Sequence, residues 1–360
     1  MTAHLLPNRT LGRTGIAVPA LGAGCWAIGG PDHNLGMPMG WSTGADQAAA
    51  IAGLETAWEL GVRLYDTADV YGHGLSERRL GHLLAQIPRE QIVVSSKVGY
   101  FAGTAEHGFD PAHMRRQLGQ SLDNLGTDYL DIYGLHHHDF GEGDRWLQPA
   151  IEAMHAFKAE GLIRAISLRG PHRFAPDRLS TPPALRGNKI ARFRALFDQV
   201  RPDILAVRDN LLTPAASSEG IFAFADQHHC GVLINKPLGQ GLLTRSHRPD
   251  QPPSFADGDH RARKRWFTAP ALAVLDEALA HLQDTIAPDR HDLLALALWS
   301  CLNRTSNGVV LTGFTNPDQI RANITAISRM PSAAQIAQAR TIITAAQERL
   351  DAEGQVFLDE

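Results

Sequence analysis

Short apolar runs alternate along most of this chain with segments whose apolar residues recur at helical spacing. The first such segment has Ile51, Leu54 and Trp58 on one helical face, and Gly61 ends it just before an apolar strand. The same step from helix to strand then repeats. The pattern predicts eight strands, at residues 20–25, 62–65, 92–96, 129–135, 163–168, 204–207, 232–234 and 309–311.

Alternating strands and amphipathic helices favour a parallel sheet, and eight repeats favour a closed (β/α)8 barrel, the TIM-barrel fold, over an open sheet. Residues 9–19 surround a Gly-Arg-Thr-Gly turn and predict a β-hairpin that precedes and caps the barrel. No linker-like composition break divides the chain, so residues 1–360 are predicted to form a single domain.

One further helix is predicted after the last strand. Its apolar face consists of Ile336, Ala339, Ile343, Ala346 and Leu350. We expect this face to pack against the outside of the barrel, and a dimer contact is the alternative.

Composition narrows the class of protein. A hydrophobic fraction of 44% is enough for a full core, and a net charge of −4 without a long basic run argues against nucleic acid as a partner. The first ten residues lack the regions of a signal peptide, and no apolar run reaches the roughly 20 residues that span a bilayer. We therefore expect a cytoplasmic protein with no membrane partner. The sequence leaves its oligomeric state open.

Candidate chemistry lies where strands end, because the carboxyl ends of the strands form the active face of such barrels. Asp66, Lys97 and His136 end or follow three successive predicted strands, and Tyr71 lies in the loop after Asp66. An ammonium beside a phenol stabilises the phenolate and lowers the pKa of the phenol, and a carboxylate keeps that ammonium charged and oriented. An imidazole can polarise a carbonyl oxygen. Together these groups suit proton transfer to an alkoxide. The alternative is a structural ion pair with a packed tyrosine and histidine.

Seven segments carry a family resemblance. They are LGRTG at residues 11–15, GVRLYDTADVYGHGLSE at 61–77, SSKVG at 95–99, LGTDYLDIYGLHHHD at 125–139, PLGQGLLT at 237–244, GDHR at 258–261 and LTGFTNPDQIRAN at 311–323. In these segments, and in their order, the chain resembles the aldo-keto reductase family. The resemblance implies a (β/α)8 barrel in which Tyr71 is the general acid, assisted by Asp66, Lys97 and His136.

The resemblance also implies a nicotinamide cofactor, with NADPH favoured and NADH possible. The segment after residue 236 resembles the loop that holds the cofactor pyrophosphate, and Asn316 with Pro317 predicts a capped helix start at the adenosine end. The residues predicted to contact the cofactor are Arg169, Lys236, Pro237, Leu238, Gly239, Gly241, Gly313, Thr315, Gln319 and Asn323.

The chain departs from the family pattern where the nicotinamide is usually held. Arg169 and Gly170 stand in place of a Ser-Asn pair, Ala206 in place of Gln, and Asn235-Lys236 in place of an aromatic-Ser pair. The basic residues here could grip the cofactor in another way, bind an acidic or phosphorylated substrate, or form structural ion pairs.

The run His136-His137-His138 does not predict a metal site, because successive side chains of a strand point to opposite faces. The Pro- and Arg-rich segment at residues 171–189 either covers the pocket or is a surface excursion.

The leading hypothesis is an oxidoreductase that interconverts a small-molecule carbonyl and an alcohol with NADP(H). One alternative is a redox-neutral epimerase or lyase that retains its cofactor, which the departures near the nicotinamide position favour. The other is a regulatory protein that binds the cofactor without catalysis.

Overall fold

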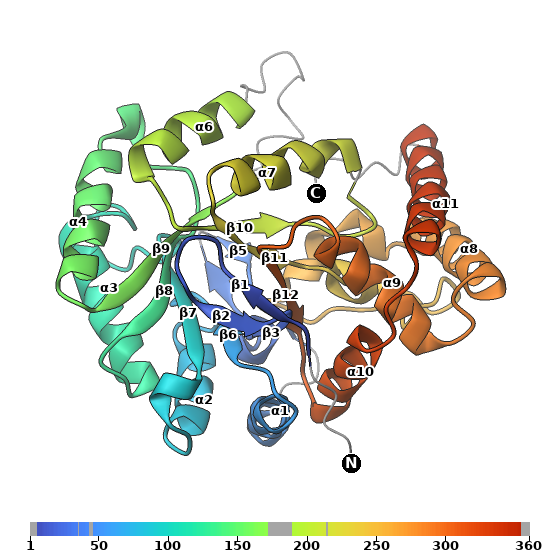
Figure 1. Ribbon diagram of the computed structural model, residues 1–360, viewed down its shortest axis with the longest axis horizontal. Coiled ribbons are helices and arrows are strands. Elements are labelled where there is room, and N and C mark those ends of the chain that lie inside the picture. The colour runs from blue at the N-terminus through green and yellow to red at the C-terminus, as the bar shows by residue number, and fades with distance from the viewer. Residues whose placement is uncertain (1–5, 35, 43–45, 172–188, 214, 354–360) are drawn as a thin grey trace.

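Eight parallel strands of the described chain close into a barrel, as the alternating pattern predicts (Figure 1). The computed structural model describes residues 6–34, 36–42, 46–171, 189–213 and 215–353. Around the barrel the strands are β10 (Ile204–Arg208), β11 (Gly231–Asn235), β12 (Gly308–Gly313), β3 (Leu21–Gly24), β6 (Leu64–Asp66), β7 (Val93–Val98), β8 (Leu130–Leu135) and β9 (Ile163–Arg169). Closure comes from the parallel pairing of β12 with β3, in which Val310 lies opposite Leu21.

A ring of helices surrounds the strands (Figure 1). These are α1 (Gln47–Glu59), α2 (Leu75–Leu84), α3 (Pro111–Leu125), α4 (Leu147–Ala159), α6 (Lys189–Val200), α7 (Ala215–Gln227), α9 (Arg290–Leu302) and α10 (Pro317–Ile327). Local signals set their ends. In α3, Asp110 caps the first turn by accepting from the amide of His113, and Gly126 ends the helix with a φ of 66°.

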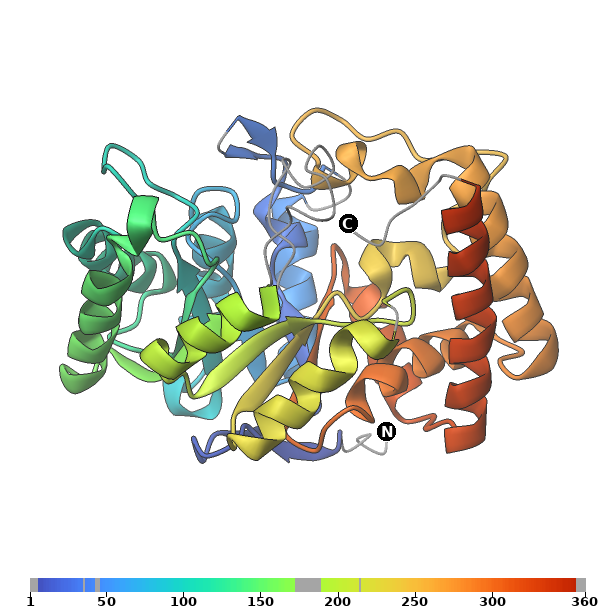
Figure 2. The same cartoon turned by 90° about the horizontal axis from the view of Figure 1, so that it is seen from above.

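The predicted N-terminal hairpin is present as β1 (Asn8–Thr10) paired antiparallel with β2 (Ala17–Pro19). Leu11, Ile16 and Val18 are buried in one cluster with inward-facing residues of the barrel strands, such as Leu64 and Ile132. The hairpin therefore closes one end of the barrel. Figure 2 shows it in dark blue, at the end opposite the loops that follow the strands.

The C-terminal helix α11 (Ala333–Ala352) packs along α8 (Ala269–Thr285), as both views show. The five apolar residues from Ile336 to Leu350 that define its predicted face are all buried. The expected packing of this helix on the outside of the barrel is thus confirmed. The sequence analysis did not anticipate α8, which follows β11 ahead of α9.

The segment between β3 and α1 contains a short two-stranded sheet that was not predicted. Within it β4 (His33–Asn34) pairs antiparallel with β5 (Met37–Pro38). Two-residue strands are too short for periodicity to reveal. The segment at residues 171–189 cannot be compared with its prediction, since residues 172–188 lie outside the described part.

Two further observations concern the whole described chain. Cys25, Cys230 and Cys301 are buried free thiols. Among the described residues, no helix is both long enough and apolar enough to cross a membrane.

Candidate active site

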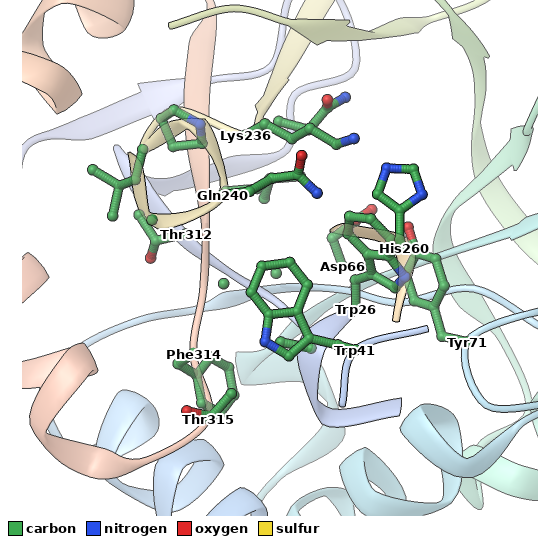
Figure 3. A pocket seen from close by; sticks show the side chains of 18 of the residues that line it. Trp26, Trp41, Asp66, Tyr71, Lys236, Gln240, His260, Thr312, Phe314 and Thr315 are labelled. Carbon is green, nitrogen blue, oxygen red and sulfur yellow. The ribbon is translucent and has the colours of Figure 1, made fainter. Parts of the chain in front are cut away.

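The four residues predicted to carry the chemistry meet at the open end of the barrel. Asp66 ends β6, Lys97 lies in β7, His136 follows β8, and Tyr71 lies in the loop before α2. All four line a cavity of about 460 Å³, which is in the range of small-molecule sites (Figure 3). The structure thus brings together groups that are 70 residues apart in sequence.

Lys97 and Asp66 form a buried ion pair. Lys97 Nζ donates to Asp66 Oδ2 at 2.7 Å and to the Thr67 carbonyl at 2.6 Å. Ser95 Oγ donates to the other carboxylate oxygen, Asp66 Oδ1, at 2.8 Å. Burial opposes the charge on Lys97, but Asp66 and the phenol of Tyr71 outweigh burial and raise the pKa of the lysine. Lys97 is therefore a fixed cation at neutral pH.

Tyr71 lies against this cation, with Lys97 Nζ 5.2 Å from the centre of its ring. Burial raises the pKa of Tyr71 above its ordinary value, and the charge of Lys97 lowers it by less. The sequence reasoning expected the effect of Lys97 to dominate. The structure differs because the phenol is enclosed by the cavity walls, so Tyr71 is protonated at neutral pH, as a general acid must be.

The backbone around Tyr71 is tightly held. The Tyr71 amide donates to the Ala68 carbonyl at 3.1 Å, and its own carbonyl accepts from the Ser76 amide at 3.2 Å. The next residue, Gly72, has a φ of 60°, and a Cβ there would lie 2.0 Å from the Gly29 carbonyl oxygen. A glycine is thus required for the turn that presents the phenol.

His136 stands beside the phenol as a neutral imidazole. Its ring centre is 5.9 Å from that of Tyr71 and 4.6 Å from that of Tyr100. Burial, followed by the charges of Lys97 and Arg169, lowers the pKa of His136 well below its usual value. A neutral imidazole has one N–H, which can polarise a carbonyl oxygen without adding a charge.

The two following histidines are directed elsewhere. The ring of His137 lies 4.5 Å from Phe109, whereas His138 Nε2 hydrogen-bonds the Arg169 carbonyl at 2.5 Å. The described residues contain no group of three or more histidine, cysteine, aspartate or glutamate side chains that could hold a metal.

The loop after β11 turns sharply beside the cavity. Lys236, Gly239, Gln240 and Gly241 all have positive φ, at 60°, 58°, 61° and 96°. The Gly239 amide donates to the Lys236 carbonyl, and the Gly241 amide to the Leu238 carbonyl. The two glycine amides thus stabilise the turn itself, while Gln240 Nε2 is buried with no hydrogen-bond partner among the described residues.

The start of α10 has the predicted cap. Asn316 accepts from the Gln319 amide at 3.1 Å, and Pro317 is the first helical residue. The Gln319 side chain accepts from the Thr315 amide at 2.8 Å. Helix N-termini of this kind favour anions, because their first N–H groups and the helix dipole point toward the ligand.

One cavity joins Asp66, Tyr71, Lys97 and His136 to both of these segments. Its lining includes all the residues predicted to contact the cofactor except Gly239. The unpartnered Gln240 amide and the start of α10 suit phosphate and ribose groups, so this side of the cavity fits a dinucleotide.

Four of the residues that depart from the family pattern in sequence also lie in the wall of the cavity. Arg169, Ala206, Asn235 and Lys236 all line the cavity. The buried Asn235 Oδ1 has no hydrogen-bond partner among the described residues.

Several lining residues were not assigned a role from the sequence. They include Trp26, Gln240, His260, Arg263 and Arg290. Gln240 and His260 belong to the motifs PLGQGLLT and GDHR, so the signal was present. Trp26, Arg263 and Arg290 had none, because they lie in loops or at a helix start without periodicity.

Comparisons with known proteins agree with this geometry. The sequence model of the aldo/keto reductase family matches residues 20–344. The NADH-specific methylglyoxal reductase of Escherichia coli (strain K12) is 28% identical over 330 residues, covering 88% of this chain and 92% of that protein. The D-threo-aldose 1-dehydrogenase of Pseudomonas sp is 32% identical over 254 residues, 64% of this chain and 69% of that one.

The solved structures add the fold. The glycerol dehydrogenase of Gluconobacter oxydans superposes with a TM-score of 0.71 at 21% identity, covering 96% of this chain and 97% of that one. The barrel, the cavity and the family match together define an oxidoreductase. The chain belongs to the aldo-keto reductase family.

Proposed function

We propose that this enzyme interconverts an aldehyde or ketone and the corresponding alcohol with NADP(H), and that Tyr71 is its general acid and base. The observation that supports the proposal is the contact of the Tyr71 phenol with the ion pair of Lys97 and Asp66, beside neutral His136. All four groups face one cavity that also reaches the capped start of α10.

Each residue has a distinct task in the reduction. The His136 N–H binds the carbonyl oxygen and polarises it, and the Tyr71 hydroxyl gives its proton to that oxygen as negative charge develops there. The cation of Lys97 stabilises the phenolate that remains. Asp66 keeps Lys97 charged and oriented through the 2.7 Å hydrogen bond. In the oxidation direction the same groups act in reverse.

A bound nicotinamide cofactor would supply or accept the hydride. Its phosphates and adenosine would be held by the turn at Pro237, Leu238, Gly239 and Gly241 and by Gly313, Thr315, Gln319 and Asn323, with Arg169 on the nicotinamide side. We assign NADP(H) by the family resemblance. We also place the enzyme in the cytoplasm, where three unpaired cysteines remain reduced.

Replacing Tyr71 with Phe tests the assignment. The variant should bind NADPH like the parent in a fluorescence titration and lose at least about 100-fold in kcat with carbonyl substrates. Tyr133→Phe is a matched control, since Tyr133 lies outside the cavity and its buried hydroxyl has no partner among the described residues. An unchanged rate in the Tyr71 variant would remove Tyr71 from the mechanism.

A redox-neutral reaction with a retained cofactor is the second candidate. The observation that favours it is the replacement of the usual nicotinamide contacts by Arg169, Ala206 and Asn235 in the cavity wall. Protein that keeps its cofactor through dialysis and shows no net absorbance change at about 340 nm with carbonyl substrates would support this candidate against net reduction.

A further inference from the structure

Basic and N–H-donating groups line the cavity wall on the side of Tyr71. We call Lys236, His260 and Arg263 the basic wall. Trp26 connects it to the catalytic residues, with Lys236 Nζ 4.9 Å from its ring and the His260 ring centre also 4.9 Å away. The same indole lies 6.2 Å from the ring of Tyr71. Figure 3 shows His260 and Trp26 near Tyr71, with Phe314 and Thr315 across the cavity.

Lys236 has no anionic partner in the described structure. Its amine makes no hydrogen bond or ion pair with any described residue, and its Nζ lies 4.9 Å from the centre of the Trp26 ring. Among the described residues, the charges that lower its pKa are those of Arg208, Lys264, Arg169 and Arg263. Burial and these charges lower the pKa of Lys236 well below its usual value. An anion placed here would relieve that repulsion.

His260 offers a second unused donor. The residue is 7% exposed, and Arg263 Nη2 lies 2.7 Å from its Nδ1. A guanidinium can only donate, so Nδ1 accepts, and the proton of the neutral ring is on Nε2. Burial lowers the pKa of His260 well below its usual value, which keeps the ring neutral. Nε2–H is therefore a buried donor without a partner among the described residues.

The segment that carries His260 is rigidly supported. Asp259 accepts from Arg261 Nη2 at 2.8 Å and from Ser42 Oγ at 2.7 Å. Arg261 also stacks over Trp41, 3.7 Å from its ring centre, and the His260 amide donates to the Gly40 carbonyl at 2.9 Å. These contacts fix the donor before a ligand arrives, which lowers the entropic cost of binding.

We propose that the basic wall binds a carboxylate or phosphate group of the carbonyl substrate and so directs the carbonyl toward Tyr71. That the bound anion belongs to a carbonyl substrate rests on the proposed function, whereas the existence of an anion site does not. Lys236 was predicted from the sequence to contact the cofactor. Its amine faces Trp26 on the side of Tyr71, whereas the start of α10 supplies an anion-binding helix end on the far side.

Anion binding can be measured without cofactor or turnover. Trp26 touches both Lys236 and His260, so its fluorescence reports on the wall, and a Trp26→Phe variant identifies its share of the signal. Titration with inorganic phosphate and with pyruvate should give saturable changes, while neutral acetone should give none. Tighter binding of phosphate would indicate a phosphate group on the substrate, and tighter binding of pyruvate would indicate a carboxylate. The absence of a saturable change with both anions would overturn the proposal.

Variants then locate the site. Lys236→Met and His260→Leu should each weaken anion binding at least about 10-fold, as expected for loss of a hydrogen bond to a charged group. Lys236→Arg and His260→Gln, which keep a donor, should retain most of it. Arg248→Gln is the control, because Arg248 lies in the same inter-helix segment, pairs with Asp250 and does not line the cavity. Equal weakening in the control would refute the site.

Kinetics separate substrate from cofactor. In Lys236→Met, kcat/KM for succinic semialdehyde should fall at least about 10-fold relative to that for butanal, with NADPH affinity within about twofold of the parent. If NADPH affinity falls by the same factor, the wall belongs to the cofactor site and the proposal is wrong. If the parent transfers no hydride at all, the proposed function fails, and the fluorescence titration still decides whether the wall binds anions.

Discussion

Lys97 Nζ lies 2.7 Å from Asp66 Oδ2, and the two side chains are only 10% and 9% exposed. Such a pair contributes little net stability, but removal of one partner leaves an isolated buried charge. The ion pair acts on the reactivity of Tyr71 more than on the stability of the fold. Asp66 holds a cation in place against the phenol of Tyr71, whose pKa would otherwise rise further through burial.

Replacing Asp66 with Asn should therefore impair catalysis as well as the stability of the fold. Without the carboxylate, the pKa of Lys97 falls, its charge is lost at lower pH, and the phenolate of Tyr71 loses its stabilising neighbour. We expect kcat to fall by about 100-fold or more, and the alkaline limit of the pH profile to move to lower pH. A kcat profile from acid to alkaline pH measures both.

Asp131→Asn is the matched control. Asp131 is equally buried and pairs with Arg89 and Arg164 at 2.8 Å each, but it does not line the cavity. Both variants should lose roughly 3 kcal/mol of unfolding free energy, as for a broken buried pair. Only the Asp66 variant should have a displaced pH profile, and an undisplaced one would contradict the role of the pair.

Acid should destabilise this protein through its buried histidines. Burial lowers the pKa of His137 and His138 from 6.5 to about 4 each. Their folded-state pKa is depressed, so the unfolded chain binds protons first as pH falls. Stability is fully present above pH 6.5 and is lost toward pH 4, by roughly 3 kcal/mol for each group.

Urea unfolding at intervals between these pH values measures that loss. In His137→Phe, the loss of unfolding free energy between pH 6.5 and pH 4 should be smaller by about half of the combined loss from the two histidines. Phenylalanine keeps the contact with Phe109 and does not titrate. His281→Phe is a control, since His281 is exposed on α8 and should leave the curve unchanged. A slope that is the same in all three proteins would show that other groups govern acid stability.

The barrel, and the meeting of Asp66, Tyr71, Lys97 and His136 at one cavity, were predictable because each follows from local pattern. Apolar runs at regular intervals identify the strands, and a polar residue at the end of such a run, as at Asp66, must face the mouth of the barrel. The basic wall was not predictable. His260 and Arg263 follow no periodic element, and their position beside Trp26 depends on contacts with distant residues such as Ser42.

Cofactor preference should depend on Arg290. This residue begins α9 at the rim of the cavity, lies in the lining with Gln319 and Asn323, and makes no ion pair with a described residue. Arg321, the basic residue evident from the sequence, lies 3.4 Å from Asp318. Basic side chains accommodate the 2′-phosphate that distinguishes NADPH from NADH.

We therefore expect Arg290→Gln to weaken NADPH binding by about 10-fold and to leave NADH binding within about twofold. Fluorescence titrations with both cofactors measure the ratio of the dissociation constants for NADPH and NADH. Arg321→Gln is the comparison and should change the ratio less, because its guanidinium already lies near a carboxylate. Equal losses for the two cofactors in Arg290→Gln would place the 2′-phosphate elsewhere.

Lys236 should lower the stability of the ligand-free enzyme. Its pKa is depressed in the folded protein, so below pH 10.5 the unfolded chain binds a proton at this site more strongly than the folded chain does. Lys236→Met should then raise the unfolding free energy by about 2 kcal/mol near neutral pH. The gain should vanish as pH rises toward 10.5, where the lysine of the unfolded chain is neutral as well.

Thermal unfolding with and without phosphate distinguishes charge from packing. A ligand that binds only the folded state stabilises it, so phosphate should raise the Tm of the parent and have little effect on Lys236→Met. Arg248→Met, on the surface, should behave like the parent in both respects. If the higher unfolding free energy of Lys236→Met persists at alkaline pH, methionine packs better than lysine against Trp26. The charge on Lys236 would then not destabilise the folded protein.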